Sequence, residues 1–283
     1  MLNDKELRVA KRSSLADRLS EVRERIAAAC AKAHRDVKEV TLVAVTKSAA
    51  PEQIREILQL GVGDLGESRV QVLTQRAAQI NEFFQRQRLH SEGLLPARLR
   101  WHMIGHLQRN KAKPVLQIVD LVHSVDSLRL AEELDTQSGK LGKKLPILLQ
   151  INASEESTKS GVAVGAAIHL AEQIDSMPNL QLVGLMTMAA LTANPEDARR
   201  TFARTREIFD EMQWQKIGGG HLRHLSMGMS NDFEQAILEG ATMVRIGSLL
   251  FGGPSGDHEE ADESANLEAR LRKQATDAES ADK

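Results

Sequence analysis

The chain has 283 residues, of which 41% are hydrophobic and 27% are charged, a balance typical of a globular protein with a sizeable core. Its formal net charge of −2 and the lack of a basic run argue against a nucleic-acid-binding surface. No apolar stretch approaches the roughly 20 residues of a membrane-spanning helix, and the N-terminus lacks the apolar segment of a signal peptide.

The numbers of cysteine and tyrosine residues limit the reactions that the chain can carry out. A single cysteine, Cys30, cannot form an internal disulfide, so the chain suits a reducing compartment and we expect it in the cytoplasm. The chain has no tyrosine, which excludes any mechanism that needs a phenol as acid or base. No set of His, Cys, Asp and Glu has the spacing of metal ligands, so we expect no metal site.

The chain begins with a predicted helix and then alternates strands with helices. Apolar residues at steps of three and four predict one long helix over residues 4–34. After it, eight short apolar runs predict strands, with helical segments between them. The runs are TLVAV (41–45), VGDLG (62–66), RWHMIG (100–105), DLVHSV (120–125), LPILLQI (145–151), LQLVGLM (180–186), HLRHLSM (221–227) and TMVRIG (242–247).

Eight strand–helix units predict a single (β/α)8 TIM barrel with an extra N-terminal helix. A doubly wound α/β sheet is the rival, but the stretch AVTKSAAPEQ at the end of the first strand lacks the glycines of G-x-G-x-x-G. We therefore predict a helix packed on the barrel over residues 1–35 and the barrel over residues 36–253. Residues 254–283 carry nine acidic and four basic side chains and are predicted to be a disordered acidic tail.

Active sites of such barrels lie at the carboxyl ends of the strands, and the first predicted strand leads into Lys47. A lysine amine in an apolar site can lose its proton and condense with a carbonyl group. An ordinary solvated strand end is the alternative. His102 and His123 alternate with apolar neighbours inside strands, and we interpret them as structural rather than catalytic.

The turns after the last two predicted strands have the character of a phosphate site. LSMGMSND and RIGSLLFG offer hydroxyls and backbone amides near helix starts, from Ser226, Ser230, Gly247 and Ser248. Two ordinary capped turns have the same pattern. A phosphate site near a reactive lysine suits a phosphorylated aldehyde such as pyridoxal 5′-phosphate (PLP), and an aldolase-type Schiff-base enzyme fits the spacing equally well.

Several longer stretches carry a family resemblance. They are LVAVTKSAAPEQI, GDLGESRVQ, WHMIGHLQRNK, HSVDSLRLAEEL, ILLQINASEESTKSGV, LVGLMTMA and LSMGMSNDFEQAILEGATMVRIGSLLFG. In these stretches the sequence resembles the YggS/PROSC-type pyridoxal phosphate homeostasis proteins, whose barrel is related to the N-terminal domain of alanine racemase. The resemblance covers about residues 41–252.

The resemblance implies a role for each matching residue. Lys47 is expected to carry PLP covalently as an internal aldimine, and Arg245 to face the pyridine nitrogen. Ser68 is expected near the ring, where many members have asparagine. The phosphate is expected to bind to Ser226, Ser230, Gly247 and Ser248.

The resemblance also implies a carrier or buffer of PLP without strong catalytic activity. Racemases of this fold use a tyrosine from a second domain, and this chain has neither a tyrosine nor, as we expect, room for that domain. A weak amino-acid racemase or another one-base PLP enzyme is the alternative. A third reading is an interaction protein that binds a partner through the acidic tail or through residues 74–100. We expect PLP-dependent enzymes as recipients, no nucleic-acid or membrane partner, and a monomer.

Overall fold

The computed structural model describes residues 13–90, 95–156, 159–190, 192 and 194–252. Within them, eight parallel strands form a closed barrel in the ring order β1-β2-β3-β4-β5-β7-β8-β9, and β9 pairs back onto β1. The short β6 is added to the edge of β5. The strands are β1 (Thr41–Val45), β2 (Asp64–Glu67), β3 (Arg100–Met103), β4 (Leu121–Val125), β5 (Leu145–Asn152), β6 (Val162–Ala163), β7 (Leu180–Met186), β8 (His224–Ser226) and β9 (Met243–Ile246).

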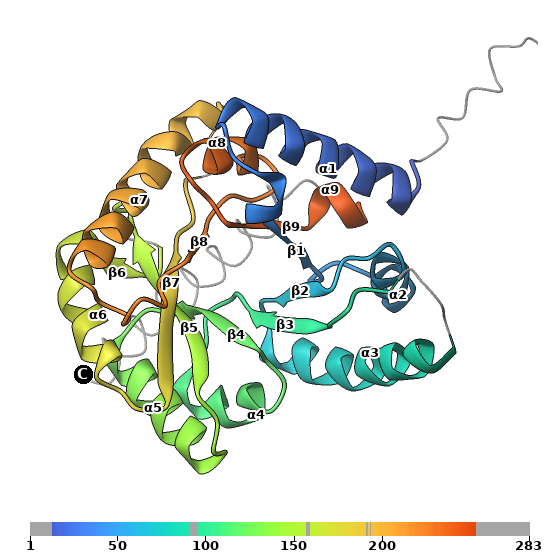
Figure 1. The fold of residues 1–283 in the computed structure, drawn as a ribbon. Coiled ribbons are helices and arrows are strands. Elements are labelled where there is room, and N and C mark those ends of the chain that lie inside the picture. The colour runs from blue at the N-terminus through green and yellow to red at the C-terminus, as the bar shows by residue number, and fades with distance from the viewer. Residues whose placement is uncertain (1–12, 91–94, 157–158, 191, 193, 253–283) are drawn as a thin grey trace, which may run out of the picture.

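Helices surround the strands on the outside of the barrel (Figure 1). The predicted (β/α)8 barrel is confirmed, and each predicted strand corresponds to an observed one within three residues at either end. The α-helices are α1 (Leu15–Lys32), α2 (Pro51–Gln59), α3 (Val70–His90), α4 (Ala112–Leu116), α5 (Leu128–Lys140), α6 (Ala167–Asp175), α7 (Arg199–Trp214), α8 (Phe233–Leu238) and α9 (Ser248–Phe251). Short 3-10 helices lie at Val37–Glu39, Arg109–Lys111, Val164–Ala166 and Pro195–Ala198.

The first helix begins later than its apolar pattern predicts. Ser14 is its N-cap: the hydroxyl of Ser14 accepts from the amide of Asp17 at 3.1 Å, and the carboxylate of Asp17 accepts from the amide of Ser14 at 3.0 Å. This capping box starts the helix at Leu15 and not at residue 4. Residues 1–12, and the predicted tail over 254–283, lie outside the described residues.

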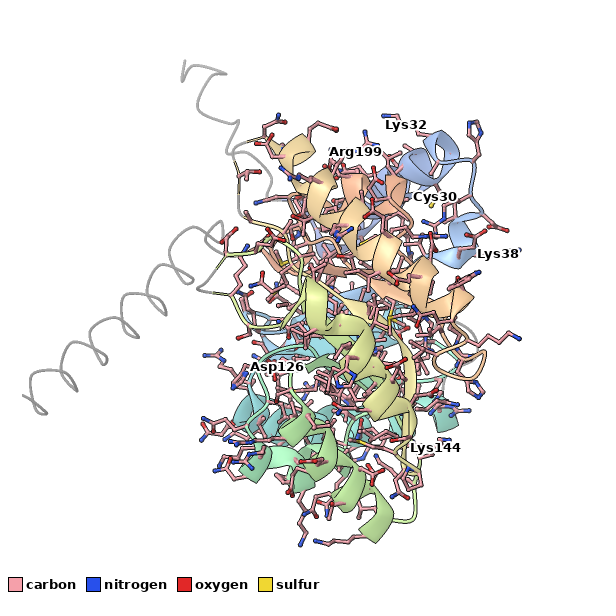
Figure 2. The ribbon with its side chains drawn as sticks, turned by 90° about the vertical axis from the view of Figure 1, so that its left-hand side faces the viewer. Cys30, Lys32, Lys38, Asp126, Lys144 and Arg199 are labelled. Carbon is pink, nitrogen blue, oxygen red and sulfur yellow. The ribbon has the colours of Figure 1, made fainter. Side chains whose placement is uncertain are left out.

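Helix α1 packs on α8 and α9, the two short helices that follow the last strands (Figure 1). Arg18 Nε donates to the carbonyl of Leu250 at 2.6 Å, and Arg25 forms an ion pair with Glu234 at 2.7 Å. Charged side chains such as Lys32, Lys38 and Lys144 lie on the outside of the molecule, whereas Cys30 in α1 is fully buried (Figure 2). The extra helix therefore belongs to the packed core and supports α8 and α9, the last two helices of the barrel.

The barrel has two apolar layers. The large cluster lies between strands and helices, and it includes the buried face of α1. The smaller cluster is built from strand residues and fills the interior of the barrel, as in other barrels of this type. Its buried members are Val43, Leu121, Leu148, Val183, Met186 and Met243. Polar side chains share the interior with this cluster, namely His102, His123, Ser226 and Arg245, all of them buried.

Candidate functional site

The end of β1 carries Lys47 at the rim of the barrel. Lys47 is half-buried, and its backbone carbonyl accepts a long contact of 3.5 Å from Arg69. The preceding Thr46 is buried, and its hydroxyl donates to Glu67 Oε2 at 3.0 Å. Arg76 donates to the same carboxylate oxygen at 2.8 Å and also to the carbonyl of Thr46. The backbone on which Lys47 sits is thus tied to the end of β2.

Glu67 is the residue that organises this rim, and the sequence motifs gave it no role. Its side chain is fully buried, and its other oxygen, Oε1, accepts from the amides of Ser68 at 2.8 Å and Arg69 at 3.3 Å. A carboxylate is tolerated there because Arg76 and several donors satisfy it. A carboxylate at the carboxyl end of a barrel strand is the sequence signal that points to such a role.

Ser68 is half-buried and lies directly after β2. Its backbone fits closely against Gly105, where an added Cβ would be only 2.3 Å from the carbonyl oxygen of Ser68. The loops after β2 and β3 therefore approach each other through a position that requires glycine. The structure places Ser68 at the same rim as Lys47, because Glu67 accepts from the amide of Ser68 and from the hydroxyl of Thr46, the residue before Lys47.

The turn after β8 places Ser230 at the mouth of the barrel. Gly228 has a φ of +90°, and an added Cβ would lie 2.6 Å from the Cβ of Ala236, so the turn requires glycine on two counts. Asp232 is the residue directly before α8, and its carboxylate accepts from the amide of Met229 within the turn at 2.6 Å. Ser230 itself is half-buried.

The turn after β9 lies beside the end of β1. The two strands pair at Ala44 and Ile246, and an added Cβ at Gly247 would lie 3.3 Å from the carbonyl oxygen of Val45. Gly247 and Ser248 are half-buried and start α9. Lys47 and Ser248 therefore leave adjacent strands at the same rim. With α8 and α9 only six and four residues long, hydroxyls and loop amides, more than helix dipoles, are the anion-binding groups here.

Ser226 occupies a different place from the other phosphate candidates. It is fully buried, and its hydroxyl contacts Arg245 Nη1 at 2.7 Å and His123 Nδ1 at 2.9 Å. The structure therefore brings Ser226 together with Arg245 inside the barrel and not with Ser230 and Ser248 in the half-buried turns. The sequence pattern did not separate the two serines of SMGMS, because they are only four residues apart.

Arg245 is a buried cation on β9. It is 4% exposed, and Nη2 donates to the carbonyl of Thr187 at 3.0 Å. Burial lowers the pKa of Arg245 to about 10, although the nearby Asp232 carboxylate acts in the opposite direction. Among the described residues, Arg245 forms no ion pair with a carboxylate. A guanidinium in this position is suited to an electron-rich ligand atom at the rim.

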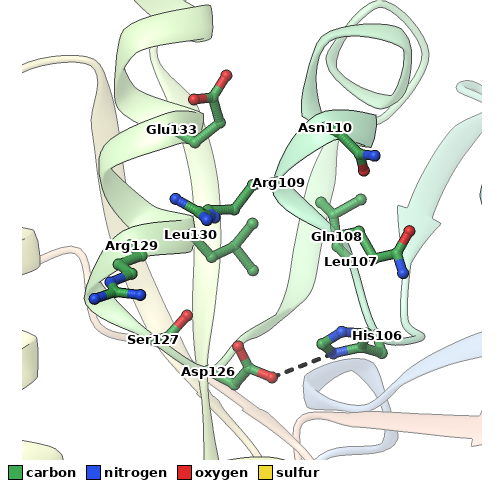
Figure 3. Close-up of a pocket in the computed structure, with 10 residues that line it drawn as sticks. All are labelled: His106, Leu107, Gln108, Arg109, Asn110, Asp126, Ser127, Arg129, Leu130 and Glu133. Atoms are coloured by element: carbon green, nitrogen blue, oxygen red, sulfur yellow. Dashed lines mark ion pairs between the residues drawn. The ribbon is translucent and has the colours of Figure 1, made fainter. Parts of the chain in front are cut away.

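A separate cleft of about 720 Å³ lies between the loops after β3 and β4 (Figure 3). His106 and Asp126 approach each other at 3.4 Å across it, with Arg109 and Arg129 above them. None of the predicted site residues lines this cleft. Over the described parts of the chain, no group of three or more His, Cys, Asp or Glu is arranged for a metal ion, and no helix has the length and apolar content of a membrane span.

Proteins with a common name are similar in sequence to most of this chain. The pyridoxal phosphate homeostasis protein of Aquifex aeolicus (strain VF5) is 42% identical over 236 residues, which cover 83% of this chain and 96% of that protein. The protein of the same name from Escherichia coli (strain K12) is 36% identical over 240 residues, covering 85% and 97% of the two chains.

Solved structures of other proteins have the same fold. PipY of Synechococcus elongatus PCC7942, solved with PLP bound, is 32% identical with a TM-score of 0.70 and covers 84% of this chain and 100% of its own. An alanine racemase of Clostridium difficile 630, at 15% identity and a TM-score of 0.60 over 84% of this chain and 61% of its own, shares the fold. The family model for the alanine racemase N-terminal domain matches residues 17–255. The chain therefore belongs to the pyridoxal phosphate homeostasis protein family, whose barrel is that of the alanine racemase N-terminal domain.

Proposed function

We propose that this protein binds PLP at the rim formed by β1, β8 and β9 and acts in PLP homeostasis. The observation that carries the proposal is the pairing of β1 with β9, which sets Lys47 beside the turn of Gly247 and Ser248. An amine and a phosphate-type turn are the two groups that a phosphorylated aldehyde requires. The relatives named pyridoxal phosphate homeostasis protein, and PipY with bound PLP, support the same ligand.

The residues of the rim fit the cofactor. When bound, PLP supplies an aldehyde that condenses reversibly with an amine and can be passed to another amine. We propose that Lys47 binds the aldehyde, and that Ser230, Gly247 and Ser248 hold the phosphate. Arg245, a buried cation without a carboxylate partner among the described residues, is suited to donate to the pyridine nitrogen.

The same residues favour a carrier over an enzyme. An arginine keeps the pyridine nitrogen unprotonated, which weakens the cofactor as an electron sink. The chain has no tyrosine to act as a second base, and its one thiol, Cys30, is buried in α1. Burial raises the pKa of this thiol further, so it is not a general base at neutral pH. We propose a monomeric, cytoplasmic protein that delivers PLP to PLP-dependent enzymes.

An absorbance spectrum tests the binding site. We expect the wild-type protein with added PLP to show a near-violet band that borohydride bleaches, with the cofactor then fixed to Lys47 in a peptide map. Lys47→Arg is expected to lose the band. Lys143→Arg is the matched control, because Lys143 precedes β5 at the opposite end of the barrel and donates to the carbonyls of Leu116 and Val119.

Lys143 is a demanding control, because burial lowers its pKa and so favours the neutral amine that reacts with an aldehyde. A band that persists in Lys47→Arg and disappears in Lys143→Arg overturns the proposed site. Incubation of the PLP-loaded wild type with an L-amino acid separates carrier from enzyme. Racemisation that disappears with Lys47→Arg overturns the carrier assignment.

A further inference from the structure

A continuous line of polar side chains crosses the barrel interior. Asp64 Oδ1 lies 2.9 Å from His102 Nε2, and His102 Nδ1 lies 2.9 Å from His123 Nε2. His123 Nδ1 lies 2.9 Å from Ser226 Oγ, and Arg245 Nη1 donates to the same oxygen at 2.7 Å. These five residues are called the interior relay below. Four hydrogen bonds thus link the first residue of β2 to the guanidinium of Arg245 on β9.

The middle of the relay is inaccessible to solvent. His102 is 1% exposed, and His123 and Ser226 are 0% exposed. Buried polar groups of this kind are costly unless each is hydrogen-bonded. The three groups are therefore satisfied by one another and by the two ends of the relay, and the positions of their protons follow from those ends.

With both imidazole rings neutral, the two ends impose one direction on the relay. Arg245 is only a donor, so Ser226 Oγ accepts from it. At the other end, burial raises the pKa of Asp64, but hydrogen bonds from His102 and Arg100 outweigh it and keep the carboxylate ionised. Arg100 Nε approaches Asp64 at 2.7 Å. An ionised carboxylate only accepts, so His102 Nε2 carries the proton that faces Asp64.

The groups between the ends complete one consistent arrangement. With its proton on Nε2, a neutral His102 accepts through Nδ1 from His123 Nε2–H. His123 then accepts through Nδ1 from the hydroxyl of Ser226. Burial, with the positive charge of Arg245 acting in the same direction, lowers the pKa of His123 well below its usual value, which agrees with a neutral ring. Each middle group therefore donates once and accepts once.

We propose that Asp64, His102, His123 and Ser226 are positioning residues, which orient Arg245 toward the pyridine nitrogen of the cofactor. This inference rests on the proposed function only for the identity of the group that Arg245 faces. Ser226 and the carbonyl of Thr187 hold two nitrogens of the guanidinium, at 2.7 and 3.0 Å, and so fix the plane of the group. The hydroxyl of Ser226 is a reliable acceptor because its own proton is engaged by His123.

The proton arrangement is tested first in the protein without PLP. Ring-nitrogen NMR at neutral pH, with assigned histidine signals, distinguishes the two neutral tautomers and the imidazolium. We expect both His102 and His123 as neutral rings with the proton on Nε2. An Nδ1–H tautomer or an imidazolium at either residue overturns the relay, whatever the protein binds.

Two substitutions at His102 test the positioning role. His102→Leu removes the acceptor of His123 Nε2–H, and we expect His123 to populate the Nδ1–H tautomer and PLP affinity to fall about tenfold. His102→Gln keeps one donor and one acceptor, and we expect it to restore the Nε2–H tautomer of His123 and most of the PLP affinity. The packing control is Leu121→Ala, since Leu121 is buried in the same interior and pairs with His102 in the strand register.

The outcomes separate the two proposals. PLP affinity in His102→Leu equal to that of Leu121→Ala overturns the positioning role. A wild type that binds no PLP overturns the proposed function and the cofactor-related part of this inference, while the tautomer measurement still decides whether the relay exists.

Discussion

At the scale of single residues, burial favours the neutral form of two histidines, His224 and His123. His224 begins β8 and is half-buried near the amino end of the barrel. Burial lowers its pKa from 6.5 to about 4, and the neighbouring cations Arg223 and Arg100 act in the same direction. His123 is shifted in the same direction for the same leading reason. Folding therefore disfavours protonation of both rings.

This arrangement predicts a loss of stability in mild acid. Below pH 6.5 the unfolded chain protonates His224 and the folded chain does not, so stability falls as the pH decreases from 6.5 toward 4 and is retained above 6.5. For His224 alone the loss is at most about 3 kcal/mol. Chemical denaturation at a series of pH values measures it. His224→Asn is expected to have a shallower slope between these pH values, and an unchanged slope contradicts the assignment.

The residue scale also shows what sequence could tell about the site. The strand-end positions of Lys47, Gly247 and Ser248 were predictable because they follow from chain order alone, whereas their roles in binding stay predictions. Ser226 was not separable from Ser230, since the difference depends on the contact of Ser226 with His123, 103 positions away in sequence. Glu67 was overlooked for the same physical reason: its importance depends on Thr46 and Arg76, which approach it only in the folded barrel.

At the scale of elements, α1 supports the two turns of the proposed phosphate site. Its buried face packs on α8 and α9, which directly follow those turns. Arg35 adds hydrogen bonds to the carbonyls of Ile237 at 3.1 Å and Ala241 at 2.8 Å, at the far end of α8. Removal of packing in α1 is therefore expected to loosen the turns as well as the helix.

Leu19→Ala tests how much the buried face of α1 contributes to stability. Leu19 is 1% exposed, and its truncation is expected to lower the free energy of unfolding by about 2–5 kcal/mol, measured by denaturant titration. The control Glu21→Ala, at an exposed position of the same helix, is expected to change it by less than about 0.5 kcal/mol. An equal effect of the two substitutions refutes a supporting role for the buried face.

Elements differ in how well their sequence predicts them. The strands were predictable because each one is a short apolar run between polar segments, and each run has the length of a single barrel strand. The start of α1 was not predictable, because the apolar pattern continues before Leu15. The first residue of the helix is set by the local hydrogen bonds between Ser14 and Asp17. The two-residue β6 was not predicted either, because a strand of two residues is too short to show an alternating apolar pattern.

At the scale of the whole molecule, the described barrel closes without the last residues of the sequence. The ring is completed by β9 against β1, and α9 ends at Phe251. Residues 254–283 hold a net excess of acidic side chains. From this composition we expect no contribution to the packed core.

Deletion of residues 254–283 is therefore expected to leave the thermal unfolding midpoint and the PLP absorbance band unchanged. Calorimetry and the absorbance spectrum of the truncated protein check this. A lower midpoint or a weaker band refutes the expectation and assigns the segment to the fold or to the site. Pull-down experiments with both forms then show whether the segment binds a partner.

The burial of Cys30 makes α1 observable in solution. Since the sequence holds this single cysteine and the folded protein covers it completely, a thiol reagent has no other target in the chain. Labelling then requires that α1 leave the barrel, so its rate at high reagent concentration equals the rate of helix opening. The same measurement with and without PLP shows whether binding at the rim slows the opening of α1, which packs on α8 and α9. It requires no spectroscopic signal from the cofactor.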